Sequence, residues 1–263
     1  MKLVRIACLC AAFLAAGCAS TSVNFRNAEI ADAPWPQRTI TALLAKPEGE
    51  GPFPAVVLLH SCGGVQPHVS QDWPEWFVKN GYVALTVDSF GSRGLPPCPN
   101  PLHPADRTPK TDAYREITRD AFGALDYLHM LPFVKRGRVA VIGFSLGANT
   151  INSFLLHQPP RPQGGFAAAV GVYGRCHDMA RYPKPAIPVL QIGGELDPAH
   201  ADSCRAVASM VDVHVLPGAH HAWDSAGSSR SGTYGETIQY SPAATARSRE
   251  LVRAFLQRHL AQR

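Results

Sequence analysis

Stretches rich in apolar residues alternate with helix-forming stretches along most of the chain. Apolar runs predict buried strands over residues 55–59, 82–87, 138–143, 166–173, 187–193 and 211–216, and an alternating, β-branched stretch predicts an edge strand over residues 39–45. Helices are predicted over residues 72–79, 112–131, 145–157, 198–210 and 243–260. The proline-rich 89–110 segment has no periodicity and predicts a long loop. This alternation favours an α/β fold, in which helices cover both faces of a mostly parallel sheet.

The beginning of the chain has the features of an export signal. Two basic residues precede an apolar run over residues 6–16, which is shorter than the roughly 20 residues needed to span a bilayer. The run ends at Gly17-Cys18, which resembles the cleavage site of bacterial lipoproteins. We therefore expect residues 1–17 to be a signal peptide that is removed before Cys18, and Cys18 to carry lipid. Ordinary signal cleavage nearby is the alternative.

Composition indicates one folded domain after a short tether. Residues 18–38 are small and polar and predict the tether, whereas residues 39–263 contain no further linker or repeat. The 263 residues are 46% hydrophobic and 17% charged, which is ample for a buried core. The net charge of +5 is not concentrated in any run, so nothing points to nucleic acid. We expect a lipid-anchored monomer on the periplasmic face of the outer membrane, because alanine rather than aspartate follows Cys18; without the lipid it would be periplasmic.

Four cysteines remain after the signal and the lipidated position are set aside. An even number in an oxidising compartment suggests two disulfides, and chain topology favours the pairs Cys62–Cys98 and Cys176–Cys204. Four reduced thiols are the alternative. The sequence has no C-x-x-C spacing, so we expect no metal site.

The strongest chemical signal is the segment Gly143-Phe144-Ser145-Leu146-Gly147. It is a G-x-S-x-G motif between an apolar strand and a helix, the setting of a nucleophile elbow. Such a turn exposes the serine, and the N-terminus of the following helix favours developing negative charge. We therefore expect Ser145 to be a nucleophile; an incidental serine in a glycine-rich turn is the alternative.

A serine nucleophile needs a base and an acid, and in this kind of fold they follow in the order acid, then histidine. Asp197 comes directly after the strand at 187–193 and is the preferred acid, with Asp178 after the preceding strand as its rival and a simple helix cap as a third interpretation. His220 and His221 follow the last predicted strand and a Pro-Gly turn. Adjacent residues point in different directions, so one of the two can face Ser145.

These motifs together resemble the dienelactone hydrolase family of α/β-hydrolases. The matching segments are Leu58 to Gly64, Tyr82 to Gly91, the elbow around Ser145, Gly194-Glu195-Leu196-Asp197, and Pro217-Gly218-Ala219 with His221 and Trp223. The resemblance runs from about residue 39 to residue 260. It implies the α/β-hydrolase fold and selects His221 as the base.

The resemblance also implies further site residues. The oxyanion would be held by the backbone N–H groups of Leu146 and Cys62, and Arg93 and Trp223 would contact the substrate. The family's name-giving enzymes use a cysteine nucleophile, where this chain has Ser145, and a second arginine, where it has Ser225. These departures favour the serine esterases of the family over an enzyme for dienelactone itself.

The resulting expectation is a serine hydrolase that cleaves a small-molecule ester or lactone through an acyl-enzyme and needs no cofactor. An acyltransferase or thioesterase on the same triad is one alternative. The other, from a different class, is a non-catalytic surface lipoprotein with a vestigial site.

Overall fold

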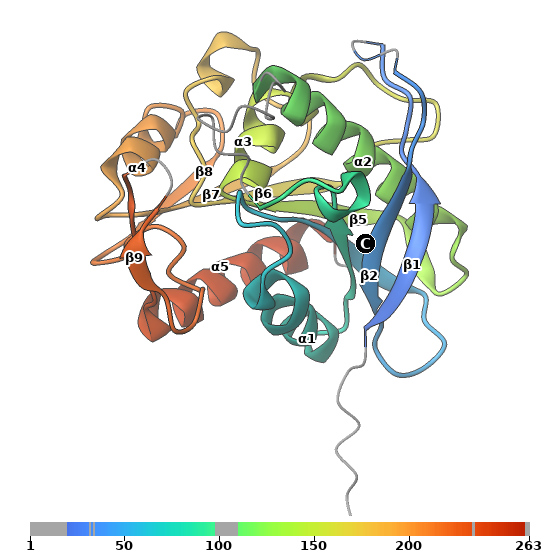
Figure 1. Ribbon diagram of the computed structural model, residues 1–263, viewed down its shortest axis with the longest axis horizontal. Coiled ribbons are helices and arrows are strands. Elements are labelled where there is room, and N and C mark those ends of the chain that lie inside the picture. Colours follow the sequence, from blue (N-terminus) through green and yellow to red (C-terminus); the bar gives the residue numbers. More distant parts are fainter. Residues whose placement is uncertain (1–19, 32, 34, 98–109, 233–234, 261–263) are drawn as a thin grey trace, which may run out of the picture.

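A computed structural model describes residues 20–31, 33, 35–97, 110–232 and 235–260 of the protein. The strands of its central sheet are β1 (Thr21–Arg26), β2 (Thr39–Ala45), β3 (Phe53–Leu59), β4 (Val83–Asp88), β5 (Val134–Phe144), β6 (Ala168–Val172), β7 (Val189–Gly194) and β8 (Asp212–Leu216). The eight strands lie in the order β1-β2-β4-β3-β5-β6-β7-β8 (Figure 1). The β1–β2 and β2–β4 pairs are antiparallel and all other pairs are parallel, as the alternating pattern predicted.

Helices cover both faces of this sheet. They are α1 (Trp73–Lys79), α2 (Lys110–Met130), α3 (Leu146–Ser153), α4 (Pro198–Arg205) and α5 (Pro242–Leu260). One hydrophobic cluster joins the sheet to α2, α3 and α4, and a second joins its other face to α1 and α5 (Figure 1). The apolar runs suit strands covered on both faces, since both sides of β6, most of β3 and residues 139–144 of β5 are buried.

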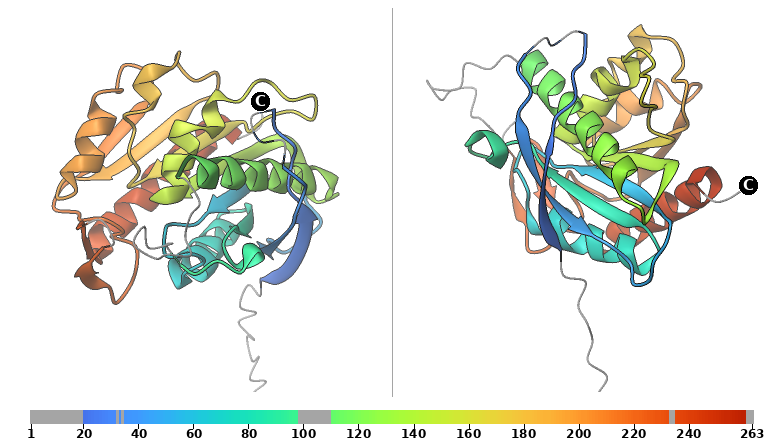
Figure 2. Two further views of the ribbon diagram at one scale, coloured as in Figure 1. Left: turned by 45° about the horizontal axis from the view of Figure 1, so that its top comes forward. Right: turned by 90° about the vertical axis from the view of Figure 1, so that its right-hand side faces the viewer.

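The N-terminal segment differs from the expected tether over residues 18–38. Residues Thr21–Arg26 form β1, which pairs with β2 along its whole length. The segment alternates, and Val23 and Phe25 pack on the core, which is the period of a strand with one buried face. Figure 2 shows β1 and β2 beside α2 at the edge of the molecule. The tether prediction was therefore wrong for these residues, since a polar-looking segment can still bury one face.

Buried charges fasten this edge to α2. The Arg119 side chain is fully buried and donates hydrogen bonds to the carbonyl oxygens of Ala28, Trp35 and Pro36. Asp120, also fully buried, accepts hydrogen bonds from Asn27 and Arg93. The N-terminal strand is therefore an integral part of the domain.

A disulfide bond joins Cys176 to Cys204, as predicted, with a Cα–Cα distance of 4.7 Å. It connects the loop after β6 to α4. Cys98 lies outside the described residues, so the Cys62–Cys98 pair stays a prediction, as does lipidation of Cys18, which also lies outside them. Among the described helices, none has the length and apolar character required to cross a membrane.

Two short strands were not predicted from the sequence. β9 (Ser229–Ser231) and β10 (Thr237–Gln239) form an antiparallel pair outside the main sheet. His221 forms an isolated bridge with Ile238 of β10, so the ribbon supports the loop that carries this histidine. Strands of three residues are too short to leave a periodic pattern in a sequence.

Candidate active site

Ser145 lies at a sharp turn between β5 and α3. Its backbone has φ 51° and ψ −104°, a region that residues other than glycine rarely adopt. A Cβ atom on Gly143 would lie 2.3 Å from the carbonyl carbon of Gly147, and one on Gly147 would lie 2.4 Å from the carbonyl oxygen of Leu59. The two glycines therefore let the helix approach the strands closely enough to close the strained turn, as the motif predicted.

His221 and Asp197 reach Ser145 from the same edge of the sheet. Asp197 follows β7 and His221 lies in the loop after β8, and the carboxyl ends of these neighbouring parallel strands meet there. The Nε2 atom of His221 is 3.0 Å from the Ser145 hydroxyl, and its Nδ1–H group donates to the Oδ2 atom of Asp197 at 2.6 Å. With its proton on Nδ1, the imidazole can accept the serine proton at Nε2.

Asp197 remains ionised although it is almost fully buried. Burial by itself would raise the pKa of this carboxyl. The hydrogen bonds from His200 and His221 outweigh burial and hold its pKa well below the usual range. An ionised carboxylate can fix the tautomer of His221 and stabilise its imidazolium form.

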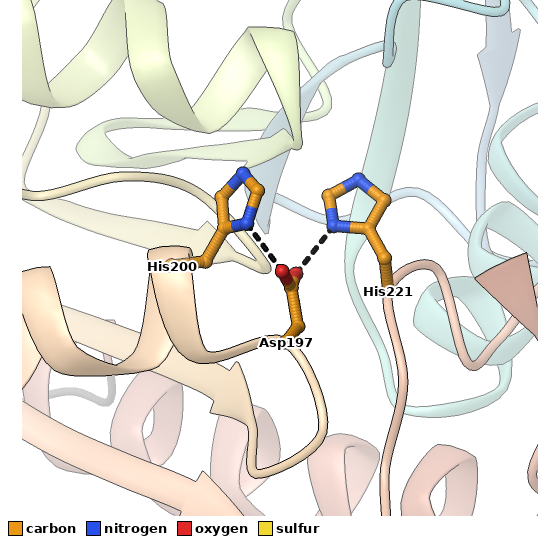
Figure 3. Close-up of side chains that lie close together, drawn as sticks. All are labelled: Asp197, His200 and His221. Atoms are coloured by element: carbon orange, nitrogen blue, oxygen red, sulfur yellow. Dashed lines mark hydrogen bonds and ion pairs between the residues drawn. The ribbon is translucent and has the colours of Figure 1, made fainter. Parts of the chain in front are cut away.

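A second histidine binds the same carboxylate. The Nδ1–H group of His200, in the first turn of α4, donates to the Oδ1 atom of Asp197 at 2.6 Å. Figure 3 shows the two imidazoles side by side above Asp197, with both Nε2 atoms directed away from it. His200 was not predicted as a site residue, although the sequence places it three residues after Asp197 at the start of a predicted helix.

These three residues are also a set of donors that suits a metal ion, with ligand atoms within 4.8 Å of one another. However, each Nδ1 lies 2.6 Å from a carboxylate oxygen. Neighbouring ligand atoms in a tetrahedral zinc site with bonds of about 2.0–2.1 Å are about 3.3 Å apart. The observed spacing therefore fits protons shared in hydrogen bonds.

The rival candidates do not make these contacts, although Asp178 lines the same cavity as Ser145. Asp178 accepts a hydrogen bond from Ser153 at 2.7 Å and lies beside His177 and Arg181, without contact to His221. His220 has no hydrogen bond to Ser145 or Asp197 in the described part of the chain. Of the alternatives left open by the sequence, the geometry brings together Ser145, His221 and Asp197.

A cavity of about 630 Å³ opens over Ser145. Leu146 and Cys62, the residues expected to supply the oxyanion-hole N–H groups, line it together with Ser145. Apolar side chains of Phe90, Ile117 and Leu95 form part of its wall. This size is typical of pockets for small organic molecules.

Arg93 lies in the cavity wall, but carboxylates already hold its guanidinium group. Its two terminal nitrogens donate to Asp120, Glu116 and the carbonyl oxygen of Ser89 at 2.7–2.9 Å. Burial opposes the charge of Arg93, yet these carboxylates outweigh it and raise its pKa above the ordinary value. A substrate carboxylate would meet Glu116 and Asp120 at this position, so the contacts do not support a substrate-binding role for Arg93.

Trp223 does not contact the cavity, which corrects its expected role in substrate binding. Its side chain is fully buried and its ring meets Tyr173 edge to face, with centroids 4.9 Å apart. The backbone of Ala222 has φ 49°, and the chain after this turn leads Trp223 into the core. Trp223 therefore anchors the loop of His221 to the hydrophobic core.

The chain is similar to several known proteins. The curated esterase FrsA of Escherichia fergusonii is 28% identical over 128 residues, 46% of this chain and 26% of the esterase, so the chain spans about a quarter of that relative. The solved dienelactone hydrolase of Anabaena variabilis superposes with a TM-score of 0.64 at 16% identity, over 92% of this chain and 98% of that one. A dienelactone hydrolase-like promiscuous phosphotriesterase from metagenomic libraries gives 0.62 at 20% identity, over 92% and 99%.

The fold of both solved structures is the α/β-hydrolase fold that the resemblance implied. The sequence profile of the dienelactone hydrolase family matches residues 40–260, which is nearly all of the described chain. Because this match covers most of its length, the chain belongs to the dienelactone hydrolase family.

Proposed function

We propose that this protein is a serine hydrolase that cleaves a small-molecule carboxylic ester or lactone. One observation carries the proposal, the unbroken series of contacts from Ser145 Oγ to His221 Nε2 at 3.0 Å and from His221 Nδ1 to Asp197 Oδ2 at 2.6 Å. Family membership and the curated esterase relative support the same class of reaction.

The proposed reaction has two steps. Ser145 Oγ attacks the ester carbonyl carbon while His221 Nε2 takes the hydroxyl proton and returns it to the leaving alkoxide. The N–H groups of Leu146 and Cys62 stabilise the oxyanion, and Asp197 stabilises the imidazolium. Water then attacks the acyl-enzyme with the same proton transfers, which releases the acid and restores Ser145.

The test combines hydrolysis of short-chain nitrophenyl esters with labelling by a fluorophosphonate probe. The Ser145→Ala variant should lose both activities while remaining folded. Ser153→Ala is the matched control, since Ser153 lines the same cavity but donates its hydroxyl hydrogen to Asp178. Near-normal turnover by purified Ser145→Ala would overturn the serine mechanism. Thioester cleavage or acyl transfer in preference to ester hydrolysis would show that the protein is a thioesterase or an acyltransferase instead.

We also propose that the protein is exported and anchored by lipid on Cys18, as a monomer on the periplasmic face of the outer membrane. The basic and apolar pattern before Gly17-Cys18 supports this. The Cys176–Cys204 disulfide adds support, because structural disulfides persist mainly in oxidising compartments. Mass spectrometry of the N-terminal peptide should find acyl groups on Cys18, and an unmodified N-terminus would refute the anchor.

A further inference from the structure

His200 is a buried histidine that the proposed two-step reaction does not use. It is 7% exposed and lines the cavity, and its ring centroid lies 4.7 Å from that of His221. Its Nδ1–H group is bonded to Asp197, whereas its Nε2 atom has no hydrogen bond to any other described residue. The contact therefore places a second imidazole on the carboxylate that orients the first (Figure 3).

Asp197 occupies the position directly before α4, where an aspartate ordinarily caps a helix. Such a residue usually accepts a hydrogen bond from a backbone N–H of the first turn through its side chain. Here the carboxylate makes no such bond, and both of its oxygens are bound to imidazoles instead. In the first turn, Pro198 has no N–H group, and the N–H groups of His200 and Ala201 donate to the carbonyl oxygen of Asp197, which leaves the N–H group of Ala199 as the backbone donor within the turn.

One hydrogen bond would leave the carboxylate free to turn. The torsion that rotates the carboxyl group of aspartate is soft, with broad wells. A bond from His221 alone would allow the group to swing toward the N–H group of Ala199. A second donor on the other oxygen opposes that rotation and fixes the plane of the carboxylate.

His200 is itself held firmly. Its carbonyl oxygen accepts a hydrogen bond from Ser203, whose hydroxyl oxygen in turn accepts the backbone N–H of Cys176. Cys204 is one helical turn after His200, on the same face of α4, and its disulfide ties this face to the loop after β6. The donor to Oδ1 of Asp197 thus belongs to a covalently anchored helix.

We infer that His200 is a positioning residue, whose Nδ1–H group holds Oδ1 of Asp197 so that Oδ2 stays bonded to His221. The inference rests on the proposed function, because it assigns a role in activating Ser145. It adds a fourth residue to the site and predicts that the site depends on a donor at position 200.

The test compares His200→Leu, which fills the space without a donor, with His200→Asn, whose amide N–H group can take the place of Nδ1–H. His200→Leu should lower kcat for a nitrophenyl ester about 10- to 100-fold, the effect of one hydrogen bond to a charged group, with little change in KM. The rate of fluorophosphonate labelling of Ser145 should fall by the same factor. His200→Asn should stay within about threefold of the original enzyme.

Proton NMR gives a readout that does not depend on the substitutions being active. Short charge-assisted hydrogen bonds shift their protons far downfield, so the original protein should show two such imidazole resonances and His200→Asn should retain one. Unchanged kcat in His200→Leu would overturn the inference. Equal losses of kcat in the Leu and Asn variants would also overturn it, because they would indicate a role in packing. A single downfield resonance in the original protein would overturn it as well, and this result can be obtained even if His200→Leu fails to fold. Activity of Ser145→Ala would overturn the proposed serine mechanism. Loss of activity in Ser145→Ala together with unchanged kcat in His200→Leu would overturn the role of His200 alone.

Discussion

Neighbouring histidines with nearly identical sequence surroundings have different environments in this protein. His221 is bonded to both Ser145 and Asp197, whereas His220 contacts neither. The difference arises because successive side chains leave the backbone in different directions. A role in catalysis should therefore be specific to one of the pair.

The first prediction compares His221→Ala with His220→Ala. Removing the base should lower kcat for ester hydrolysis by on the order of 10² to 10⁴ or more, because the serine hydroxyl is then not deprotonated in the transition state. His220→Ala should remain near the original rate. Steady-state kinetics on both purified variants will decide, and greater sensitivity at His220 would contradict the assignment.

The second prediction concerns His60, which is almost fully buried before the loop that carries Cys62. Burial lowers the pKa of this imidazole more than its hydrogen bond to the carbonyl oxygen of Ser61 raises it. The unfolded chain therefore binds a proton more readily than the folded one between the lowered pKa and the ordinary value of 6.5. The free energy of unfolding should consequently fall as the pH drops through that window.

The measurement is urea unfolding at about pH 8 and about pH 5.5, on either side of the ordinary histidine pKa. His60→Asn keeps a donor for Ser61 but does not titrate. Its loss of stability between the two pH values should be smaller than that of the original protein. Equal losses in the two proteins would show that His60 does not contribute.

At the scale of elements, the turn from β5 into α3 decides whether Ser145 is exposed to substrate. Alanine normally favours a helix over glycine by about 1 kcal/mol. At Gly147, however, a Cβ atom would lie 2.4 Å from the carbonyl oxygen of Leu59. This oxygen belongs to the backbone of the central sheet, so moving it away from the Cβ atom would cost considerable free energy. The clash should outweigh the gain in helix propensity.

We therefore predict that Gly147→Ala destabilises the protein by about 2–3 kcal/mol and abolishes ester hydrolysis. Denaturant unfolding and a nitrophenyl ester assay are the measurements. Gly165→Ala is the control, because a Cβ there meets nothing within 4 Å, and it should change stability by less than about 0.5 kcal/mol. A stable, active Gly147→Ala variant would disprove the close approach of helix and strand.

At the scale of the whole molecule, a buried ionic network joins the N-terminal edge to the helix that borders the cavity. Asp120 connects Asn27, before the second strand of the sheet, to Arg93 in the cavity wall. Removal of Asp120 would take away the fully buried partner of Arg93, with Glu116 as the remaining carboxylate on that guanidinium, and the acceptor of the buried Asn27 amide. The network therefore ties the stability of the fold to the shape of the cavity.

Asp120→Ala should lower the free energy of unfolding by about 3–5 kcal/mol. Asp112→Ala removes a carboxylate from the same helix, where it pairs with Arg115 at 3.0 Å in a partly exposed position, and should cost less than about 1 kcal/mol. Both values are accessible by urea unfolding. Equal, small effects in the two variants would refute a structural role for the network.

The sequence by itself predicted seven of the eight strands of the central sheet, the main helices, and Ser145, Asp197 and His221 as the preferred candidates for the site. A short apolar run with β-branched valines, such as that of β3, favours a strand covered on both faces, since a buried helix would need a longer run. The elbow around Ser145 is equally explicit, since its glycines are required within a few residues of the turn. Signals of this kind are local, so a sequence carries them in full.

Tertiary structure alone decided which polar groups meet across the fold. Arg93 lies in the loop where a substrate anchor was expected, but carboxylates of α2 hold it, and Trp223 turns into the core below its histidine. The second imidazole on Asp197 likewise became visible only when α4 was placed against the loop of His221. The direction and partners of a polar side chain depend on residues distant in the chain, and no local pattern records them.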